Sequence, residues 1–289
     1  MNNSEIIYHT LPDKDFAELL DEAVRYALIS LPFTIDRMNL KNPRRQIKNI
    51  AKGKIAEKYF KDYAQKNGIK INFNSCTTPF WQVDKRDFKL ANKEWDLKNN
   101  FIYHDQNFNS FLNLPALIPN RHSKDQWDTR NETVHHDTTG VNFLFTFMKG
   151  APLIDGSRGR YFFDIDINQS QIKWINSLVK KYQGKPKNNQ PFNKDDFWEK
   201  INSKGPKVAA IQNFVPKLII TGYSCKEYWD KFRDTGPYSQ NNYKNYNGNW
   251  YRKVGRNDSL KFLNGEIWTT ITNATVPVEY LPSFSLFVK

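Results

Sequence analysis

Apolar side chains recur at helical spacing in two stretches near the start of the chain. In residues 13–31 they fall three or four positions apart, which predicts a helix that ends at the following Pro-Phe pair. A second helix is expected over residues 43–67, where Gly68 stops it, and Glu57 lies beside its apolar ridge. A glycine inside a helix costs about 1 kcal/mol relative to alanine, so Gly53 in this helix predicts a close approach by another segment.

Later segments are rich in β-branched and aromatic residues and are separated by turn residues, which is typical of strands. Strands are expected over residues 69–73, 114–118, 141–148, 161–167 and 217–223, with helices over residues 169–181 and 226–232. Residues 266–288 return to a strand-like pattern. Helices first, then strands with occasional helices between them, favour a mixed α/β (α+β-like) fold with a central mixed β-sheet flanked by helices.

The chain has 289 residues, enough to bury a sizeable core in one large domain. We expect residues 1–225 to form a core that includes the N-terminal helices. Residues 226–289 are expected to form a C-terminal elaboration packed on the same domain.

The charge narrows the class of partner. Lys and Arg number 43 against 30 acidic residues, a formal net charge of +13, which favours a polyanion: nucleic acid first and an anionic membrane surface second. The two cysteines, Cys76 and Cys225, lack metal-ligand spacing and predict no disulfide framework. No signal peptide or membrane-spanning stretch is visible, so a cytoplasmic location is expected. No phosphate-binding loop or dinucleotide fingerprint indicates an organic cofactor.

The candidate chemistry lies in residues 81–101, WQVDKRDFKLANKEWDLKNNF. This stretch predicts two short strands joined by a tight turn, the first ending with Asp87 and the second carrying Asp96 and Lys98. Side chains alternate along a strand, so Asp96 and Lys98 share one face while Leu97 points to the other. Two carboxylates and an ammonium at one place suit a hydrated divalent cation and a phosphate, because hard cations prefer oxygen ligands.

An acid followed nine residues later by acid-x-Lys resembles the PD-(D/E)XK nuclease superfamily, which includes most type II restriction endonucleases. The resemblance covers residues 44–150 and extends by strand order to residue 223. It implies a restriction-endonuclease-like core in which Asp87, Asp96 and the Leu97 carbonyl hold Mg²⁺. Lys98 would face the attacking water, and Glu57 would be a further acid near the metal.

The chain departs from the family pattern in ways that leave alternatives open. Arg86 stands where the family has Pro, and Asp rather than Glu fills the second acidic position. Asp84 rivals Asp87 as the first acid, and Glu94 shares the strand face of Asp96 as a supporting group. The acids and Lys98 are otherwise explained as surface charges on an exposed hairpin.

Two further groups of polar residues could suggest a metal site, but a simpler structural explanation is preferred for each. His135, His136 and Asp137 are expected to form a polar loop rather than a metal site, because adjacent histidines diverge on a helix or a strand. Asp164 and Asp166 form the exposed face of a strand.

Three polar segments, residues 120–130, 184–194 and 238–256, are candidates for DNA contact, because Lys and Arg bind phosphates and Arg, Lys, Asn and Gln read base edges. The DNA-contacting residues expected within the first and third are Arg121, Lys124, Arg130, Lys244, Asn245, Arg252, Lys253 and Arg256. The expected function is a Mg²⁺-dependent type II restriction endonuclease acting on double-stranded DNA as a homodimer. The alternatives are a repair, transposition or phage-defence nuclease of the same superfamily, and a basic nucleic-acid-binding protein without catalysis.

Overall fold

The structure is a computed structural model that describes most of the chain. The described residues are 1–34, 42–82, 86–102, 111–119, 141–150, 161–182, 187–225, 244–246, 249–254, 259–262, 265–268 and 273–289. Within these residues, no helix is both long enough and apolar enough to cross a membrane.

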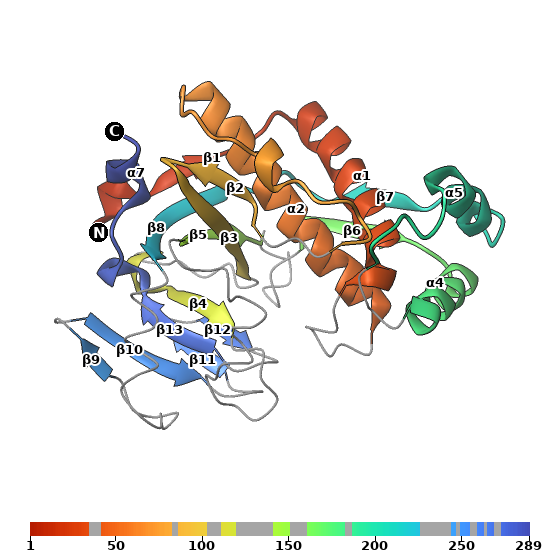
Figure 1. Ribbon diagram of the computed structural model, residues 1–289. Coiled ribbons are helices and arrows are strands. Elements are labelled where there is room, and N and C mark those ends of the chain that lie inside the picture. Colours follow the sequence, from red (N-terminus) through yellow and green to blue (C-terminus); the bar gives the residue numbers. More distant parts are fainter. Residues whose placement is uncertain are drawn as a thin grey trace.

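A mixed five-stranded sheet forms the centre of the molecule (Figure 1). Its strand order is β1 (Ile7–His9), β8 (Leu218–Cys225), β5 (Asn142–Lys149), β3 (Lys93–Ile102) and β2 (Phe88–Leu90). β3 and β5 run parallel, and the other neighbouring pairs are antiparallel. β5 is buried almost throughout, as expected for a strand covered on both faces. The mixed α/β class with a central mixed sheet is therefore confirmed.

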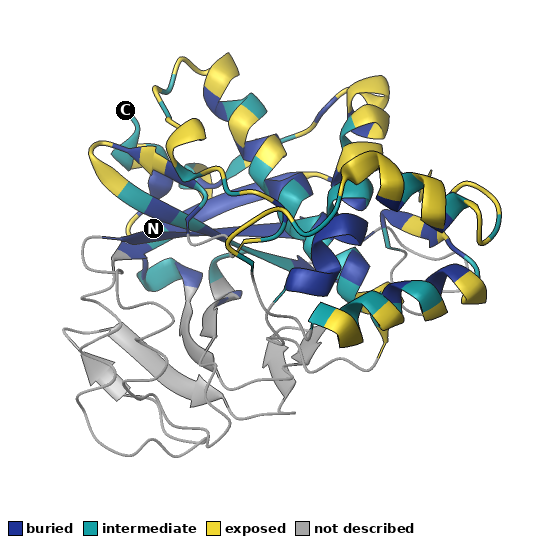
Figure 2. Ribbon diagram, turned by 45° about the vertical axis from the view of Figure 1, so that its right-hand side comes forward, coloured by how far each residue is buried: buried dark blue, intermediate teal, exposed yellow. Residues whose placement is uncertain are grey.

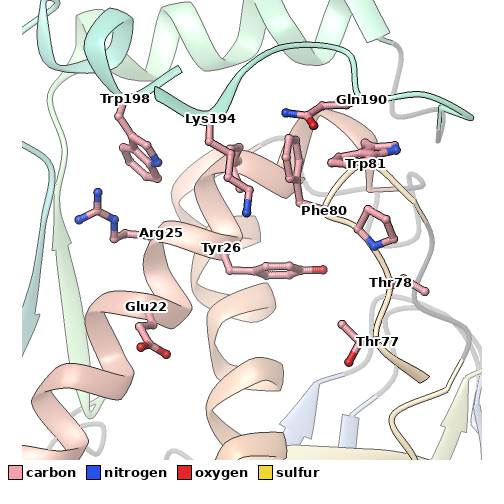
Figure 3. Close-up of a pocket in the computed structure, with 12 residues that line it drawn as sticks. Glu22, Arg25, Tyr26, Thr77, Thr78, Phe80, Trp81, Gln190, Lys194 and Trp198 are labelled. Carbon is pink, nitrogen blue, oxygen red and sulfur yellow. The ribbon is translucent and has the colours of Figure 1, made fainter. Parts of the chain in front are cut away.

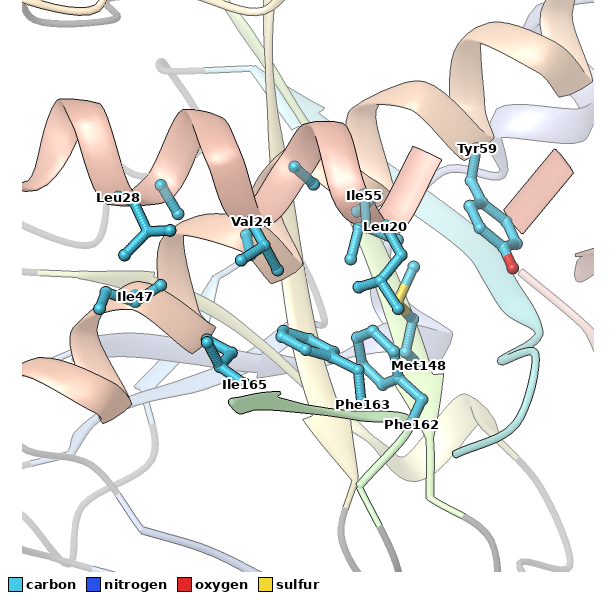
Figure 4. Close-up of a cluster of buried hydrophobic side chains, with 14 of the residues drawn as sticks. Leu20, Val24, Leu28, Ile47, Ile55, Tyr59, Met148, Phe162, Phe163 and Ile165 are labelled. Atoms are coloured by element: carbon cyan, nitrogen blue, oxygen red, sulfur yellow. The ribbon is translucent and has the colours of Figure 1, made fainter. Parts of the chain in front are cut away.

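The long helix α2 (Pro43–Lys66) packs against β3 and β8 on one face of this sheet, and a second long helix, α1 (Asp13–Ser30), packs against α2 (Figures 1 and 2). Both match the helices predicted from apolar spacing. Figure 4 shows the side chains that pack between them. Leu20, Val24 and Leu28 of α1 point toward the apolar side chains of α2 and of the strands below. The opposite face of the sheet packs a second apolar cluster around Phe145 and Phe147 of β5.

The β2–β3 hairpin turns at Ala91 and Asn92, whose φ angles of 50° and 58° lie in the left-handed region. A two-residue turn with both φ angles positive matches the twist of paired strands, and Asn adopts this conformation at low cost. The tight turn was expected, but the prediction that the first strand ends with Asp87 was wrong. The strand begins immediately after Asp87, whose amide donates to the Trp95 carbonyl at 2.9 Å.

Other predicted elements formed with small shifts of boundary. β4 (Pro115–Pro119), β6 (Phe163–Asp166) and α4 (Gln169–Tyr182) lie where strands and a helix were expected. The strand expected over residues 69–73 was wrong: only a bridge between Asn72 and Lys89 forms there, because a 3₁₀ turn follows at once. The helix expected over residues 226–232 lies outside the described residues.

Several short elements were not predicted because each spans too few residues to define a period. These are α5 (Lys194–Asn202), β7 (Ala209–Gln212), α7 (Phe284–Phe287) and the 3₁₀ turns η1 (Asn3–Glu5), η2 (Leu31–Phe33), η3 (Asn74–Cys76), η4 (Phe111–Asn113) and η6 (Val278–Tyr280). β7 pairs with β6 in a separate two-stranded sheet. Phe197 and Ile201 alone are buried on α5.

A second sheet joins β4 to strands from the C-terminal part of the chain. Its order is β4, β13 (Asn273–Pro277), β10 (Asn249–Val254) and β9 (Lys244–Tyr246), and β11 (Ser259–Phe262) pairs with β12 (Gly265–Trp268). Phe284 of α7 packs on Phe60 and Trp95 in the main core. Segments before and after residue 225 are thus interleaved in the fold.

The start of α2 is fixed by a side-chain cap, which gives a first prediction. The Asn42 side chain accepts hydrogen bonds from the amides of Arg44 and Arg45 at 3.0 and 3.4 Å. We expect Asn42→Ala to lower the free energy of unfolding by about 1 kcal/mol, because two helix amides lose their acceptor. Thermal unfolding monitored by circular dichroism measures the loss, and Asn42→Asp should retain most of the stability.

Candidate active site

The β2–β3 hairpin carries Asp87, Asp96 and Lys98: Asp87 immediately precedes β2, and Asp96 and Lys98 lie on β3. The Lys98 ammonium donates to Asp96 Oδ2 at 2.6 Å, and both side chains are largely buried, at 17% and 14% exposed. The Asp87 carboxylate accepts a hydrogen bond from the Leu97 amide at 2.5 Å. These charges therefore lie in a partly enclosed place beside β3, and the interpretation of an exposed hairpin with surface charges does not fit their burial.

Glu57 lies on α2, near enough to Asp87 for its charge to act on that carboxyl. Its Oε2 atom accepts from the Lys54 ammonium at 2.9 Å, one helical turn earlier. Burial raises the pKa of Asp87 well above its usual range, and the negative charges of Glu57 and Asp96 raise it further. Lys54 and the Leu97 amide act in the opposite direction. Glu57, Asp87 and Asp96 are therefore close enough for each of the outer two to repel charge on Asp87.

The three acids approach from two sides of the sheet. Asp96 and Lys98 share the face of Phe143, whose ring centroid is 5.6 Å from the Lys98 ammonium. Glu57 comes from α2, on the opposite face. Asp87 lies between them at the edge of β3 that faces away from β5.

Leu97 contributes its backbone to the same edge. Its side chain is only 9% exposed and packs in the core. The N–H and C=O of one strand residue point to the same side, so the Leu97 carbonyl lies on the edge where its amide meets Asp87. This is the position expected of a backbone oxygen ligand.

The donors fit a hard divalent cation better than a soft one. In the described parts of the chain, no group of three or more His, Cys, Asp or Glu side chains is placed so that it could hold a metal ion. The cluster instead offers carboxylate and carbonyl oxygens, the ligands that Mg²⁺ prefers, and Mg²⁺ retains several waters of its own. Burial raises the pKa of Asp87, and the negative charges of Glu57 and Asp96 raise it further. A bound cation would offset that repulsion.

Arg86, the residue before Asp87, belongs to an ion-paired group with Glu94. Arg86 is buried at 7% exposure, and its Nε lies 3.3 Å from Glu94 Oε2. Lys89 lies 3.6 Å from the other oxygen of Glu94. Glu94 is therefore engaged by cations of the hairpin. Asp84, the rival first acid, lies outside the described residues.

The basic residues around Glu57 were missed from the sequence. Lys54 pairs with Glu57, and its ammonium lies 5.0 Å from the ring centroid of Tyr26 on α1. Lys52 is half-buried, and burial together with repulsion from Arg45 lowers its pKa to about 8. The sequence pattern that could have indicated them is Lys-Gly-Lys at residues 52–54, just before Glu57. The close approach predicted at Gly53 was wrong, because a Cβ built there would meet no atom within 4 Å.

Lys52 gives a second prediction. Its pKa is lower folded than unfolded, so between about pH 8 and the ordinary lysine value the unfolded chain binds more protons, and stability rises with pH. Below this window the full penalty remains. We expect Lys52→Gln to raise the free energy of unfolding at pH 7 by about 1–2 kcal/mol and to flatten this pH dependence. Urea unfolding at several pH values measures the gain in stability and its pH dependence. If the stability of the variant rises with alkaline pH as steeply as that of the wild type, Lys52 is not the group responsible.

The remaining candidates lie away from the cluster or outside the described residues. Asp164 pairs with Lys48 and accepts from Asn213, and Asp166 is exposed on β6, as expected for a surface strand. Lys244 and Asn245 lie on β9, and Arg252 and Lys253 on β10. Those outside the described residues are Arg121, Lys124, Arg130, His135, His136, Asp137 and Arg256.

No protein-family model matches the chain, and neither a curated protein nor a solved structure matches it.

Proposed function

We propose that the protein is a Mg²⁺-dependent endonuclease that hydrolyses phosphodiester bonds in double-stranded DNA. The observation that carries this proposal is the Lys98–Asp96 ion pair on β3 beside Asp87, whose carboxyl accepts from the Leu97 amide and is influenced by the charges of Glu57 and Asp96. The pKa of Asp87 is raised by burial and then by the charges of Glu57 and Asp96, and perturbed pKa values of this kind cluster at functional sites. The resemblance of the sequence to the PD-(D/E)XK superfamily points to the same chemistry, so we also propose a restriction-endonuclease-like core.

The proposed roles follow from the chemistry of each group. Asp87, Asp96 and the Leu97 carbonyl would hold Mg²⁺, and Glu57 would complete the acidic edge. When bound, the ion would neutralise phosphate charge and lower the pKa of a coordinated water. Lys98, held by Asp96 at 2.6 Å, orients the attacking water and offsets the charge that develops on it.

The reaction balances without another reactant. The water oxygen bonds to phosphorus, and its proton passes to a base or to solvent. The bond from phosphorus to the leaving sugar oxygen breaks, and that oxygen takes up a proton. Hydrolysis of this kind needs positioned water and charge stabilisation, and the cluster contains groups suited to both.

Site-specific cutting of double-stranded DNA, as by a type II restriction enzyme, is the form of the activity we propose. The net charge of +13 supports a nucleic-acid substrate. Cutting both strands at a palindrome needs two active sites, so we propose a twofold homodimer. Contacts to DNA from β9 and β10 belong to the same proposal.

Incubation with plasmid DNA in the presence of Mg²⁺ or EDTA tests the function. Discrete fragments that require Mg²⁺ support a site-specific endonuclease. Fragments without preferred ends favour a repair, transposition or phage-defence nuclease. Salt-sensitive DNA binding with no cleavage under any divalent ion would overturn the proposal and leave a nucleic-acid-binding protein.

A further inference from the structure

A cavity of about 720 Å³ opens between α1, the segment before the catalytic hairpin and the start of α5 (Figure 3). Four aromatic rings line it: Tyr26, Phe80, Trp81 and Trp198. Phe80 is buried and meets Trp81 edge to face, with centroids 4.8 Å apart. The volume falls within the range of roughly 300–1,000 Å³ that is typical of small-molecule sites.

Two cations among these rings set the charge of a suitable ligand. The Arg25 guanidinium lies 4.7 Å from the ring centroid of Trp198, and the Lys194 ammonium lies 5.8 Å from that of Phe80. Figure 3 shows the Lys194 side chain directed into the cavity. The acid at its margin, Glu22, pairs with Lys58. Arg25 and Lys194 disfavour a cationic ligand and favour an anionic one. The aromatic rings favour a planar group that can stack on them.

The cavity is close to the acidic cluster. Lys54 bonds to Glu57 on one side and lies 5.0 Å from the Tyr26 ring centroid on the other. Trp81 precedes Arg86 by five residues on the segment that leads to Asp87. One lysine therefore separates the wall of the cavity from the proposed catalytic carboxylates.

We propose that this cavity binds an unpaired nucleotide, with its base stacked on the aromatic rings and its phosphate paired with Lys194 and Arg25. A base in a duplex presents its edges, whereas an unpaired base presents the π-faces that aromatic side chains recognise. The ligand is either a free mononucleotide or an unpaired residue of a strand. The second source rests on the proposed function, since the strand would then be the substrate.

Calorimetric titration with a nucleoside monophosphate in EDTA tests binding without any cleavage. Binding should be tighter than that of the nucleoside or of inorganic phosphate, because base and phosphate each contribute. Trp198→Ala and Lys194→Ala should each weaken it about tenfold, a loss in the range expected for one stacking or charged contact. Lys200→Ala, on the same helix but outside the cavity, is the matched control and should bind as the wild type does.

A second titration distinguishes the source of the nucleotide. A duplex with one unpaired 2-aminopurine should change fluorescence on binding, and the fully paired duplex should not. A response to this duplex alone indicates a strand residue, and a response to the mononucleotide alone indicates a free ligand. Either result supports the site.

The proposed nucleotide site would be overturned if neither titration gave a response. It would also be overturned if inorganic phosphate bound as tightly as the nucleoside monophosphate. Lys194 is exposed, so its variant is expected to fold and keeps the test decisive. A nuclease that cuts plasmid DNA yet shows neither response would refute the cavity alone. A protein that responds but does not cut would refute the nuclease alone.

Discussion

Asp96→Ala and Lys98→Ala are each expected to lower the rate of Mg²⁺-dependent DNA cleavage by about 10³-fold, the range seen when one group that stabilises developing charge or transfers a proton is removed. Asp96 is a proposed metal ligand and also holds Lys98 at 2.6 Å, so its loss removes two contributions. Lys98→Ala leaves both carboxylates in place and removes the ammonium together with the aliphatic stem that carries it. Single-turnover cleavage of a labelled duplex measures the chemical step for each variant.

Controls on the same strand separate loss of chemistry from loss of structure. Lys93→Ala, at the exposed start of β3, removes a positive charge outside the cluster and should cut at the wild-type rate. The double variant Asp96→Ala/Lys98→Ala should be no slower than Asp96→Ala, because residues that act as one unit are not additive. Cleavage retained by both single variants would remove this site from the proposed function.

The main elements of the fold could be predicted because their apolar spacing is long and regular. Both N-terminal helices and the buried strand β5 extend over eight residues or more, which leaves little ambiguity of period. The short helix α5 buries only Phe197 and Ile201, too few positions to define a period. Pairing of β4 with β13 joins segments more than 150 residues apart, and local pattern carries no information on such contacts.

The candidate site could be predicted in part, because the alternation of side chains along a strand is a local property. Strand alternation places Asp96 and Lys98 on one face whatever surrounds them, and their contact was therefore foreseeable. The position of Asp87 depended on where the turn falls, and an Ala-Asn pair is a weak turn pattern beside the glycine-containing pairs that usually mark such turns. The i,i+3 pair of Lys54 with Glu57 lies within one helix, but the contact of Lys54 with Tyr26 was not foreseeable, because it depends on the packing of α1 against α2.

Asp87→Asn is expected to stabilise the metal-free protein while it lowers cleavage sharply. Asn retains an oxygen that accepts from the Leu97 amide, and it removes the charge that burial, Glu57 and Asp96 oppose. Relief of a poorly compensated buried group stabilises by roughly 1–3 kcal/mol. At about 2–4 °C per kcal/mol for large domains, the melting temperature in EDTA at neutral pH should rise by several degrees.

The pH dependence distinguishes this cause from a general packing effect. The pKa of Asp87 is higher folded than unfolded, so between those two values the folded state binds more protons and stability falls as pH rises. The penalty is absent below the ordinary carboxyl range and complete above the folded pKa. Asp87→Asn should therefore match the wild type at low pH and exceed it at neutral pH. Asp166→Asn, on the exposed face of β6, should change stability by less than about 0.5 kcal/mol at either pH.

Mg²⁺ links this stability difference to the proposed chemistry. An ion that binds only the folded state stabilises it in proportion to the logarithm of its concentration. Titration with Mg²⁺ should thus raise the melting temperature of the wild type and narrow its deficit relative to Asp87→Asn, which lacks one carboxylate ligand. If Mg²⁺ raises the melting temperature of the wild type and of the variant equally, Asp87 is not a ligand. If the variant is less stable than the wild type in EDTA, the Asp87 carboxylate stabilises the metal-free fold. In that case the penalty from burial and from the charges of Glu57 and Asp96 is not the dominant effect.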